Sequence, residues 1–310
     1  MKRTWLQFAV LFLFVAGLLA SPGCRKADVA AASEPAVLRL AFVPQQDQEE
    51  RYQAAYTALR SYLLEAMAMP VEVLQLDNAN AALEAMRAHK LDVCNFSPWP
   101  FLIAEQKAGA EAFLVTGAPD GRPVSYHTLL IAHASSGLKT VADIKRRSRE
   151  LVFSFEEPVS TSGHLVPRAF FHREAGINPE QDFKQTLFSA DSTISILAVK
   201  ARRIDVAAVS DSGLRRNIAM GRVPADEITI VWESDPVLSN VMAIRRDLPP
   251  GFKARLRAAL IALPTASPAT WAHVVRQYSN PVSSYLPATD AILAPYREMV
   301  RTVPGLQVTL

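Results

Sequence analysis

From residue 38 onward, hydrophobic residues follow two alternating patterns along the chain. Short apolar runs of roughly four to eight residues, typical of buried strands, are separated by longer stretches whose apolar residues recur every three or four positions, as in helices. Segment 38–43 shows the first pattern, and segment 49–67 shows the second. The alternation predicts strands and helices in turn along one chain.

The same alternation continues almost to the C-terminus. We expect strands at 38–43, 71–76, 91–96, 112–116, 126–132, 151–155, 185–189, 205–209, 227–232 and 241–245. We expect helices at 49–67, 79–89, 98–108, 141–147, 165–175, 193–201, 212–220 and 252–263, and a proline-rich, helical end. Strands separated by helices indicate an α/β fold with mostly parallel sheets, and the length of 310 residues indicates two lobes.

The N-terminal segment has the features of an export signal. A basic start, Lys2-Arg3, precedes the apolar run 5–20 and the small residues before Cys24. Gly23-Cys24 is similar to the end of a bacterial lipoprotein signal. We predict a signal peptide over 1–23, lipidation of Cys24, a tether over 24–37, and a location in the periplasm or cell envelope, anchored to the membrane.

Charge and cysteine content narrow the function classes. The formal net charge is +3, and the leader contributes two of those positive charges, which leaves +1 after its removal. No basic stripe interleaved with aromatic residues appears, so the sequence gives no indication of nucleic-acid binding. The two cysteines are Cys24 and Cys94. If Cys24 carries lipid, Cys94 is a lone thiol and no intrachain disulfide can form.

Motifs for catalysis are missing from the sequence. It contains no Gly-x-Ser-x-Gly elbow, no His-Glu-x-x-His, no dinucleotide fingerprint and no Lys-containing phosphate loop. Ser162 and His164 stand too close in sequence to impose the geometry of a triad. We therefore expect a binding protein rather than an enzyme, with no cofactor and no metal.

The segment 160–164, Ser-Thr-Ser-Gly-His, stands where a strand passes into a helix. A helix N-terminus offers unpaired N–H groups and a partial positive charge, so a small oxyanion can bind there without lysine or arginine. The alternative is an ordinary serine cap. Segments 44–47, 94–99 and 191–192 also follow strands, and ligands of open α/β sheets bind beyond the carboxyl ends of the strands.

Taken together, these segments resemble those of the periplasmic phosphate/phosphite/phosphonate-binding proteins, the PhnD-like solute receptors of ABC transporters. The resemblance covers most of 38–301 and depends chiefly on the Ser-Thr-Ser-Gly segment. Weaker matches, in the same order along the chain, complete it: Ala41 to Pro44, Lys90 to Val93, Tyr126, Val141 to Lys145, Glu157 to Pro167, and Ile204 to Val209.

The resemblance implies a two-lobed, type II-like binding protein with two sheets joined by two crossover strands. It implies a first lobe of 38–121 plus 236–310 and a second lobe of 122–235. The ligand is then a small tetrahedral oxyanion, the partner an ABC permease, and the protein a monomer. By this resemblance, Ser160, Thr161 and Ser162 clamp the ligand oxygens and Tyr126 reaches them from the hinge side.

The chain departs from the family pattern after the next strand. The family often has Gly-Ser-His-Asp there, whereas this chain has Ala190-Asp191-Ser192-Thr193. A usual anion donor is therefore missing at Ser192, and Asp191 would repel a dianion if it pointed inward. His164 is a candidate to compensate. The acidic residue that holds an aminoalkyl tail in some members falls near Asp211.

Cys94 and Trp99 are further candidates beside the expected cleft. Trp99 either covers the ligand or packs in the core. Cys94 is either a small buried hydrophobe or a thiolate ligand for a soft centre such as trivalent arsenic. The second reading gives the alternative function, an arsenite-sensing receptor of the same fold that signals to a membrane histidine kinase.

Overall fold

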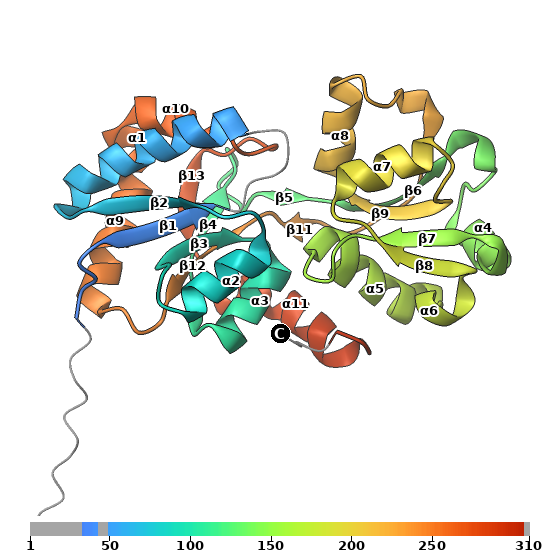
Figure 1. The fold of residues 1–310 in the computed structure, drawn as a ribbon, viewed down its shortest axis with the longest axis horizontal. Coiled ribbons are helices and arrows are strands. Elements are labelled where there is room, and N and C mark those ends of the chain that lie inside the picture. Colours follow the sequence, from blue (N-terminus) through green and yellow to red (C-terminus); the bar gives the residue numbers. More distant parts are fainter. Residues whose placement is uncertain (1–32, 43–48, 307–310) are drawn as a thin grey trace, which may run out of the picture. The chain divides into compact units, whose positions relative to one another are not determined.

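The computed structural model describes residues 33–42 and 49–306, which belong to one compact unit. The leader, Cys24 and the turn at 44–47 lie outside the described residues. Two sheets organise the unit, and helices cover both faces of each sheet (Figure 1). We call the part around the six-stranded sheet the first lobe and the part around the five-stranded sheet the second lobe.

The first lobe has the strand order β13-β4-β12-β3-β1-β2. Its strands are β1 (Leu38–Phe42), β2 (Val71–Gln75), β3 (Val93–Phe96), β4 (Ala110–Gly117), β12 (Val241–Arg245) and β13 (Ser284–Pro287). Buried residues of α1 (Glu49–Met67) and α9 (Pro250–Ala266) share one core cluster with these strands, beside α10 (Pro268–Val275). A second core cluster contains buried residues of three other helices, α2 (Ala79–Arg87), α3 (Pro98–Lys107) and α11 (Asp290–Thr302).

The second lobe has the strand order β10-β6-β9-β7-β8. Its strands are β6 (Thr128–His133), β7 (Val152–Phe155), β8 (Gln185–Phe188), β9 (Val206–Ser210) and β10 (Ile228–Glu233). The helices α7 (Ser192–Lys200) and α8 (Asp211–Ala219) lie on one face (Figure 1). The other face carries α4 (Val141–Arg147), the helical run 161–175, which includes α5 (Val166–Phe170), and α6 (Pro179–Asp182).

The sheets are mixed rather than mostly parallel. The strand β1 pairs with β2 and β3 in parallel, and β7 pairs with β8 and β9 in parallel. By contrast, β12 runs antiparallel between β3 and β4, and β6 runs antiparallel between β9 and β10. The cause is the path of the chain, which leaves the first lobe through β4 and returns through β12 in the opposite direction. Between the sheets, β5 (Ser125–Tyr126) and β11 (Val237–Leu238) pair as an antiparallel two-stranded link.

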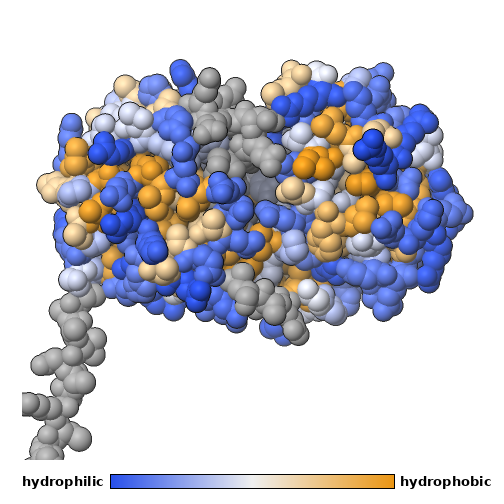
Figure 2. All heavy atoms as spheres, viewed as in Figure 1, coloured by the Kyte–Doolittle hydropathy of each residue, from blue (hydrophilic) through white to orange (hydrophobic). Residues whose placement is uncertain are grey.

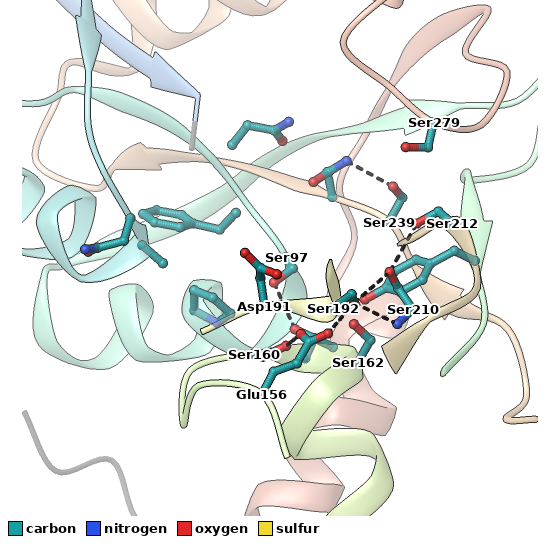
Figure 3. Close-up of a pocket in the computed structure, with 18 of the residues that line it drawn as sticks. Ser97, Glu156, Ser160, Ser162, Asp191, Ser192, Ser210, Ser212, Ser239 and Ser279 are labelled. Atoms are coloured by element: carbon teal, nitrogen blue, oxygen red, sulfur yellow. Dashed lines mark hydrogen bonds between the residues drawn. The ribbon is translucent and has the colours of Figure 1, made fainter. Parts of the chain in front are cut away.

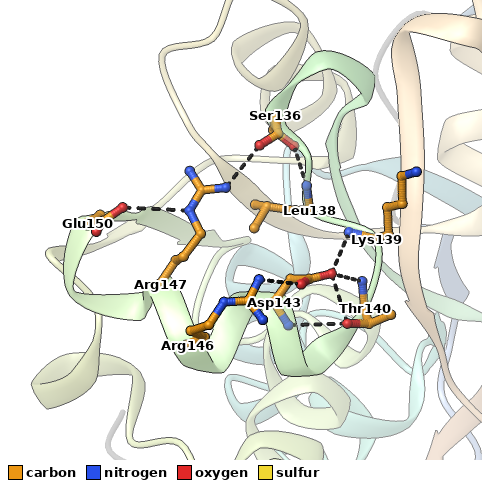
Figure 4. Close-up of polar contacts among 8 residues, drawn as sticks. All are labelled: Ser136, Leu138, Lys139, Thr140, Asp143, Arg146, Arg147 and Glu150. Atoms are coloured by element: carbon orange, nitrogen blue, oxygen red, sulfur yellow. Dashed lines mark hydrogen bonds and ion pairs between the residues drawn. The ribbon is translucent and has the colours of Figure 1, made fainter.

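Local sequence signals explain several helix boundaries. The helix α4 has the predicted bounds, and a capping box fixes its start (Figure 4). The Thr140 side chain accepts the Asp143 N–H at 3.2 Å, and the Asp143 carboxylate accepts the Thr140 N–H at 3.0 Å. The predicted helix 165–175 instead begins at Thr161, and it ends at Gly176, whose φ of +58° suits glycine.

The C-terminal part differs most from the expectation. The sequence predicted only helical structure after 263, whereas β13 adds an edge strand to the first sheet beside β4. The short strand contains Pro287, which is tolerated because an edge strand pairs on one side only.

Among the described residues, no single helix has the length and hydropathy of a membrane span. The helices α9 and α10 meet both criteria only when taken together, and they are bent by 99° relative to each other.

Hydrophilic residues cover much of the face in Figure 2, with hydrophobic patches among them over both lobes. The helix α1 shows both environments in adjacent leucines: Leu63 is 1% exposed in the core, and Leu64 is 42% exposed. The helical period turns one residue to the core and the next one to solvent.

These two leucines give a matched test of the core. We expect Leu63→Ala to lower the free energy of unfolding by about 2–5 kcal/mol, because it removes buried methyl groups and leaves a cavity. Leu64→Ala makes the same chemical change on the exposed side of the same helix. It should change the free energy of unfolding by no more than about 0.5 kcal/mol. Urea unfolding of both variants measures the difference, and equal losses would contradict the packing described.

Candidate functional site

The site is built around the turn that joins β7 to the helical run 161–175. The N–H of Glu156 donates to the carbonyl of Gly163 at 2.9 Å, which folds the turn back onto the helix start. Ser160 caps the helix, and its Oγ accepts the Gly163 N–H at 3.0 Å. The N–H of Leu165 donates to the carbonyl of Ser160 at 3.0 Å, so the first turn is a wide one that spans five residues.

Glu156 lies beneath this helix start, and its side chain is buried. Its Oε2 accepts from the Ser160 hydroxyl at 2.7 Å, and its Oε1 accepts from the Ser192 hydroxyl (Figure 3). Burial is the main cause that raises the pKa of Glu156, to about 7, and the two serine hydroxyls oppose this shift. Gly163 makes room for the carboxylate, because a Cβ there would lie 2.3 Å from its side-chain carbons.

Ser162 and Tyr126 approach each other from different elements. Ser162 is 7% exposed at the helix start, and Tyr126 lies on the link strand β5. Burial raises the pKa of Tyr126, and the side-chain hydrogen bond with Ser162 opposes that shift. The two hydroxyl groups therefore lie together, and the tyrosine is a neutral phenol at physiological pH.

Thr161 connects the helix start to the first lobe. Its Oγ1 accepts the N–H of Trp99 at 2.9 Å and donates to the Oγ of Ser97 at 3.0 Å. The indole N–H of Trp99 donates to the carbonyl of Pro158 at 2.9 Å. These three bonds join the N-terminus of α3 to the turn, so the Thr161 hydroxyl is occupied within the protein.

A cavity of about 450 Å³ opens in front of the helix start, within the usual size range of ligand sites. Residues from both lobes line it. Its hydroxyl-bearing residues are Tyr52, Ser97, Tyr126, Ser160, Thr161, Ser162, Ser192, Thr193, Ser210, Ser212, Ser239, Tyr278 and Ser279. Figure 3 shows serines of several elements around one space. The lining is thus rich in groups that both donate and accept hydrogen bonds.

The charged lining is mainly acidic. Four carboxyl groups line the cavity, those of Asp77, Glu156, Glu157 and Asp191, whereas Arg216 is the one basic side chain among the described lining residues. The Asp191 Oδ1 caps α7 by accepting the Ile194 N–H at 2.9 Å. An oxyanion in this cavity would meet hydroxyls and carboxylates together, since the Ser160 and Ser192 hydroxyls are themselves bonded to Glu156.

A family model described as the periplasmic substrate-binding protein of phosphonate ABC transporters matches residues 40–291. The chain belongs to this family. The Escherichia coli "Phosphonates-binding periplasmic protein" is 27% identical over 166 residues, 54% of this chain, and the chain spans only 48% of that relative. The "Phosphate-import protein PhnD" of Mycolicibacterium smegmatis is 26% identical over 227 residues, 70% of this chain and 68% of that protein.

A solved structure supports the same fold. The binding protein component of an ABC phosphonate transporter from Pseudomonas aeruginosa has a TM-score of 0.71 at 23% identity and covers 86% of both chains. The predicted α/β, two-lobed binding-protein fold is confirmed. Family members are substrate-binding components rather than enzymes.

The structure brings together four of the predicted site residues. Ser160, Thr161, Ser162 and Tyr126 all line the cavity. Ser192 and Asp191, where the chain departs from the family pattern, line it too. Because Asp191 lines the cavity, its negative charge would oppose a dianion bound there.

His164 does not line the cavity, although it follows the glycine of the motif. Its Nδ1 lies 2.7 Å from the carbonyl of Pro158, and its Nε2 accepts from Arg168 Nε at 2.9 Å. Burial lowers its pKa to about 4, so the ring is neutral at physiological pH. Because both ring nitrogens are occupied, His164 does not replace the anion donor missing at position 192.

Cys94, Trp99 and Asp211 also lie outside the cavity lining. Cys94 is fully buried in β3 between Ala41 and Ala243 of the neighbouring strands. Trp99 is 3% exposed and packs in the core, so it does not cover a ligand. Asp211 begins α8, where its Oδ2 pairs with Arg215 at 2.5 Å.

The burial of Cys94 removes the basis of the arsenic-sensing alternative. Burial raises the pKa of the thiol, so the protonated form dominates, and a thiol ligand acts as the thiolate. Neither the family nor the relatives named above supports that function. Among the described residues, no group of three or more His, Cys, Asp or Glu side chains could hold a metal ion.

Sequence reasoning missed Glu156 and Ser210 as lining residues. An available signal was the acidic pair 156–157 directly after the apolar strand 151–155, where a ligand is expected beyond the strand end. Ser210 stands at the corresponding end of β9, and its Oγ caps α8.

The buried thiol gives a direct test of this arrangement. In a Cys24→Ser variant, Cys94 should react with a thiol-specific dye at least tenfold more slowly than a free peptide thiol, because protein encloses it and burial raises its pKa. Full reactivity should return in denaturant. Labelling of the folded protein at the peptide rate would contradict the position of Cys94 in β3.

Proposed function

We propose that the chain is the exported substrate-binding component of an ABC importer and captures a small tetrahedral oxyanion: phosphonate, phosphite or phosphate. One observation carries the proposal. The start of the helical run 161–175, with Ser160, Ser162 and Tyr126 around it, opens onto the cavity that residues of both lobes line.

The physical argument concerns hydrogen-bond donors. The first N–H groups of a helix have no partner within the helix, and the helix dipole adds partial positive charge there. The hydroxyl of Ser162 lies at this end beside the phenol of Tyr126. Together these groups would surround an oxygen of the ligand without a lysine.

The relatives' names support the class of ligand. The name of the Escherichia coli protein refers to phosphonates, and that of the Mycolicibacterium smegmatis protein refers to phosphate import. Both ligands are tetrahedral oxyanions. Because the chain spans only part of the first relative, we carry over the chemical class and leave the choice among its members to experiment.

We also propose how the ligand would be handed on. The lobes at 38–121 plus 236–310 and at 122–235 close around the ligand, and the closed form presents a changed surface to the permease. A ligand that bridges both lobes favours the closed state by its higher affinity for it.

The N-terminal leader also suggests how the protein is attached to the membrane. We propose that 1–23 is removed, that Cys24 is lipidated, and that 24–37 tethers a monomer to the membrane. Mass spectrometry of the mature protein would find a lipid mass on Cys24 and none after Cys24→Ala.

Calorimetric titration tests the ligand class. We expect phosphate, phosphite or methylphosphonate to bind, and Ser162→Ala to weaken that binding by roughly 10- to 150-fold, the equivalent of about 1.5–3 kcal/mol for a hydrogen bond to a charged group.

The matched control is Ser61→Ala, the same change on the exposed side of α1. It should leave the dissociation constant unchanged. Absence of heat for all three anions would overturn the proposal, and equal affinities of the Ser162→Ala and wild-type proteins would remove Ser162 from the site.

A further inference from the structure

Glu156 is the unusual group of this site, because a carboxylate is buried directly beneath the proposed oxyanion position. Both of its oxygens accept hydrogen bonds from serines that line the cavity: Oε2 from Ser160 at 2.7 Å and Oε1 from Ser192 (Figure 3). The carboxylate thus connects the end of β7 with the start of α7.

These bonds decide what the serines can offer a ligand. A serine hydroxyl has one proton to donate and lone pairs to accept with. Ser160 donates its proton to Glu156 and accepts the N–H of Gly163 at 3.0 Å. Ser192 donates to Glu156 and accepts the N–H of Ser210 at 3.2 Å. While Glu156 is ionised, neither hydroxyl has a proton for an oxyanion.

The two neighbouring carboxylates favour the protonated form of Glu156. Asp191, on the turn before α7, and the adjacent Glu157 add to the burial that raises the pKa of Glu156 to about 7. The neutral phenol of Tyr126, on β5, lines the same cavity, as does Arg216 of α8, which carries the opposite sign of charge. An incoming anion would add a further negative charge, which favours the protonated form of Glu156.

We propose that Glu156 is a positioning residue that couples capture of the oxyanion to the uptake of one proton. This inference rests on the proposed function. A proton from solvent adds to a carboxylate oxygen of Glu156, and the resulting carboxyl donates it to the hydroxyl oxygen of Ser160 or Ser192. That serine keeps its own proton and can turn its O–H group toward the ligand. Protonation of Glu156 also removes one negative charge from beneath the ligand.

The test compares the wild-type protein with Glu156→Gln, whose neutral amide can donate to a serine at every pH. Methylphosphonate and phosphate are titrated calorimetrically from pH 5.5 to 8.5. The ratio of wild-type to variant dissociation constants cancels the ionisation of the ligand itself. We expect a constant ratio below about pH 6 and a rise of roughly tenfold per pH unit above pH 7.

A second measurement uses only the wild-type protein and so does not depend on whether a variant folds. Titration of the wild-type protein at pH 8 in two buffers of different ionisation enthalpy counts the protons taken up on binding. Phosphate and methylphosphonate exchange protons of their own, so methanesulfonate, which stays a monoanion, is included as a probe. We expect an uptake approaching one proton for each ligand after correction for the ligand's own titration.

Glu157→Gln is the matched control, since Glu157 lines the same cavity next to Glu156. Because Glu157 helps to raise the pKa of Glu156, this variant should keep the pH-dependent rise of its own dissociation constant and begin that rise at a slightly lower pH, so the ratio of wild-type to Glu157→Gln constants should not increase with pH. A flat ratio for Glu156→Gln, no proton uptake by the wild-type protein, or an equal slope for Glu157→Gln would overturn the coupling and leave the proposed function standing. Absence of binding by the wild-type protein at every pH would overturn both.

Discussion

The arrangement of the site depends on one backbone hydrogen bond, from the N–H of Glu156 to the carbonyl of Gly163 at 2.9 Å. It closes the turn after β7 and brings the side chain of residue 156 under the first turn of the following helix. Glycine at 163 is required there, because any Cβ would meet the glutamate side chain. The position of the serine hydroxyls, and with it the chemistry of the cavity, follows from this closure.

The cavity uses hydroxyl groups where a site with fixed positive charge would use lysine or arginine. A hydroxyl both donates and accepts, so its role is set by its neighbours rather than by its own ionisation. Thr161 is occupied by Ser97 and Trp99 of the first lobe, and Ser160 is occupied by Glu156. Three consecutive residues with similar side chains therefore have different partners: Ser160 donates to the Glu156 carboxylate, Thr161 bonds to the first lobe, and Ser162 lies beside Tyr126.

Much of the fold could be predicted from periodicity and turn residues. The segments 49–67, 141–147 and 241–245 have the predicted bounds, and the Ser-Thr-Ser-Gly segment indicated a helix start at a strand end. Strand direction could not be predicted, because a run such as 241–245 carries no information about which neighbour it pairs with. The roles of His164 and Cys94 could not be predicted either. Both depend on long-range packing, against Arg168 in one case and between β1 and β12 in the other.

The hydrophobic core crosses from one lobe to the other. One buried cluster contains Val159, Leu165 and Ala169 of the second lobe together with Phe101 of α3 and Tyr296 of α11. Arg173 adds a bond to the carbonyl of Glu298 at 2.9 Å. Loss of either sheet would strip apolar surface from the other, so the two halves should denature together in a single cooperative transition, although each has a sheet and core of its own.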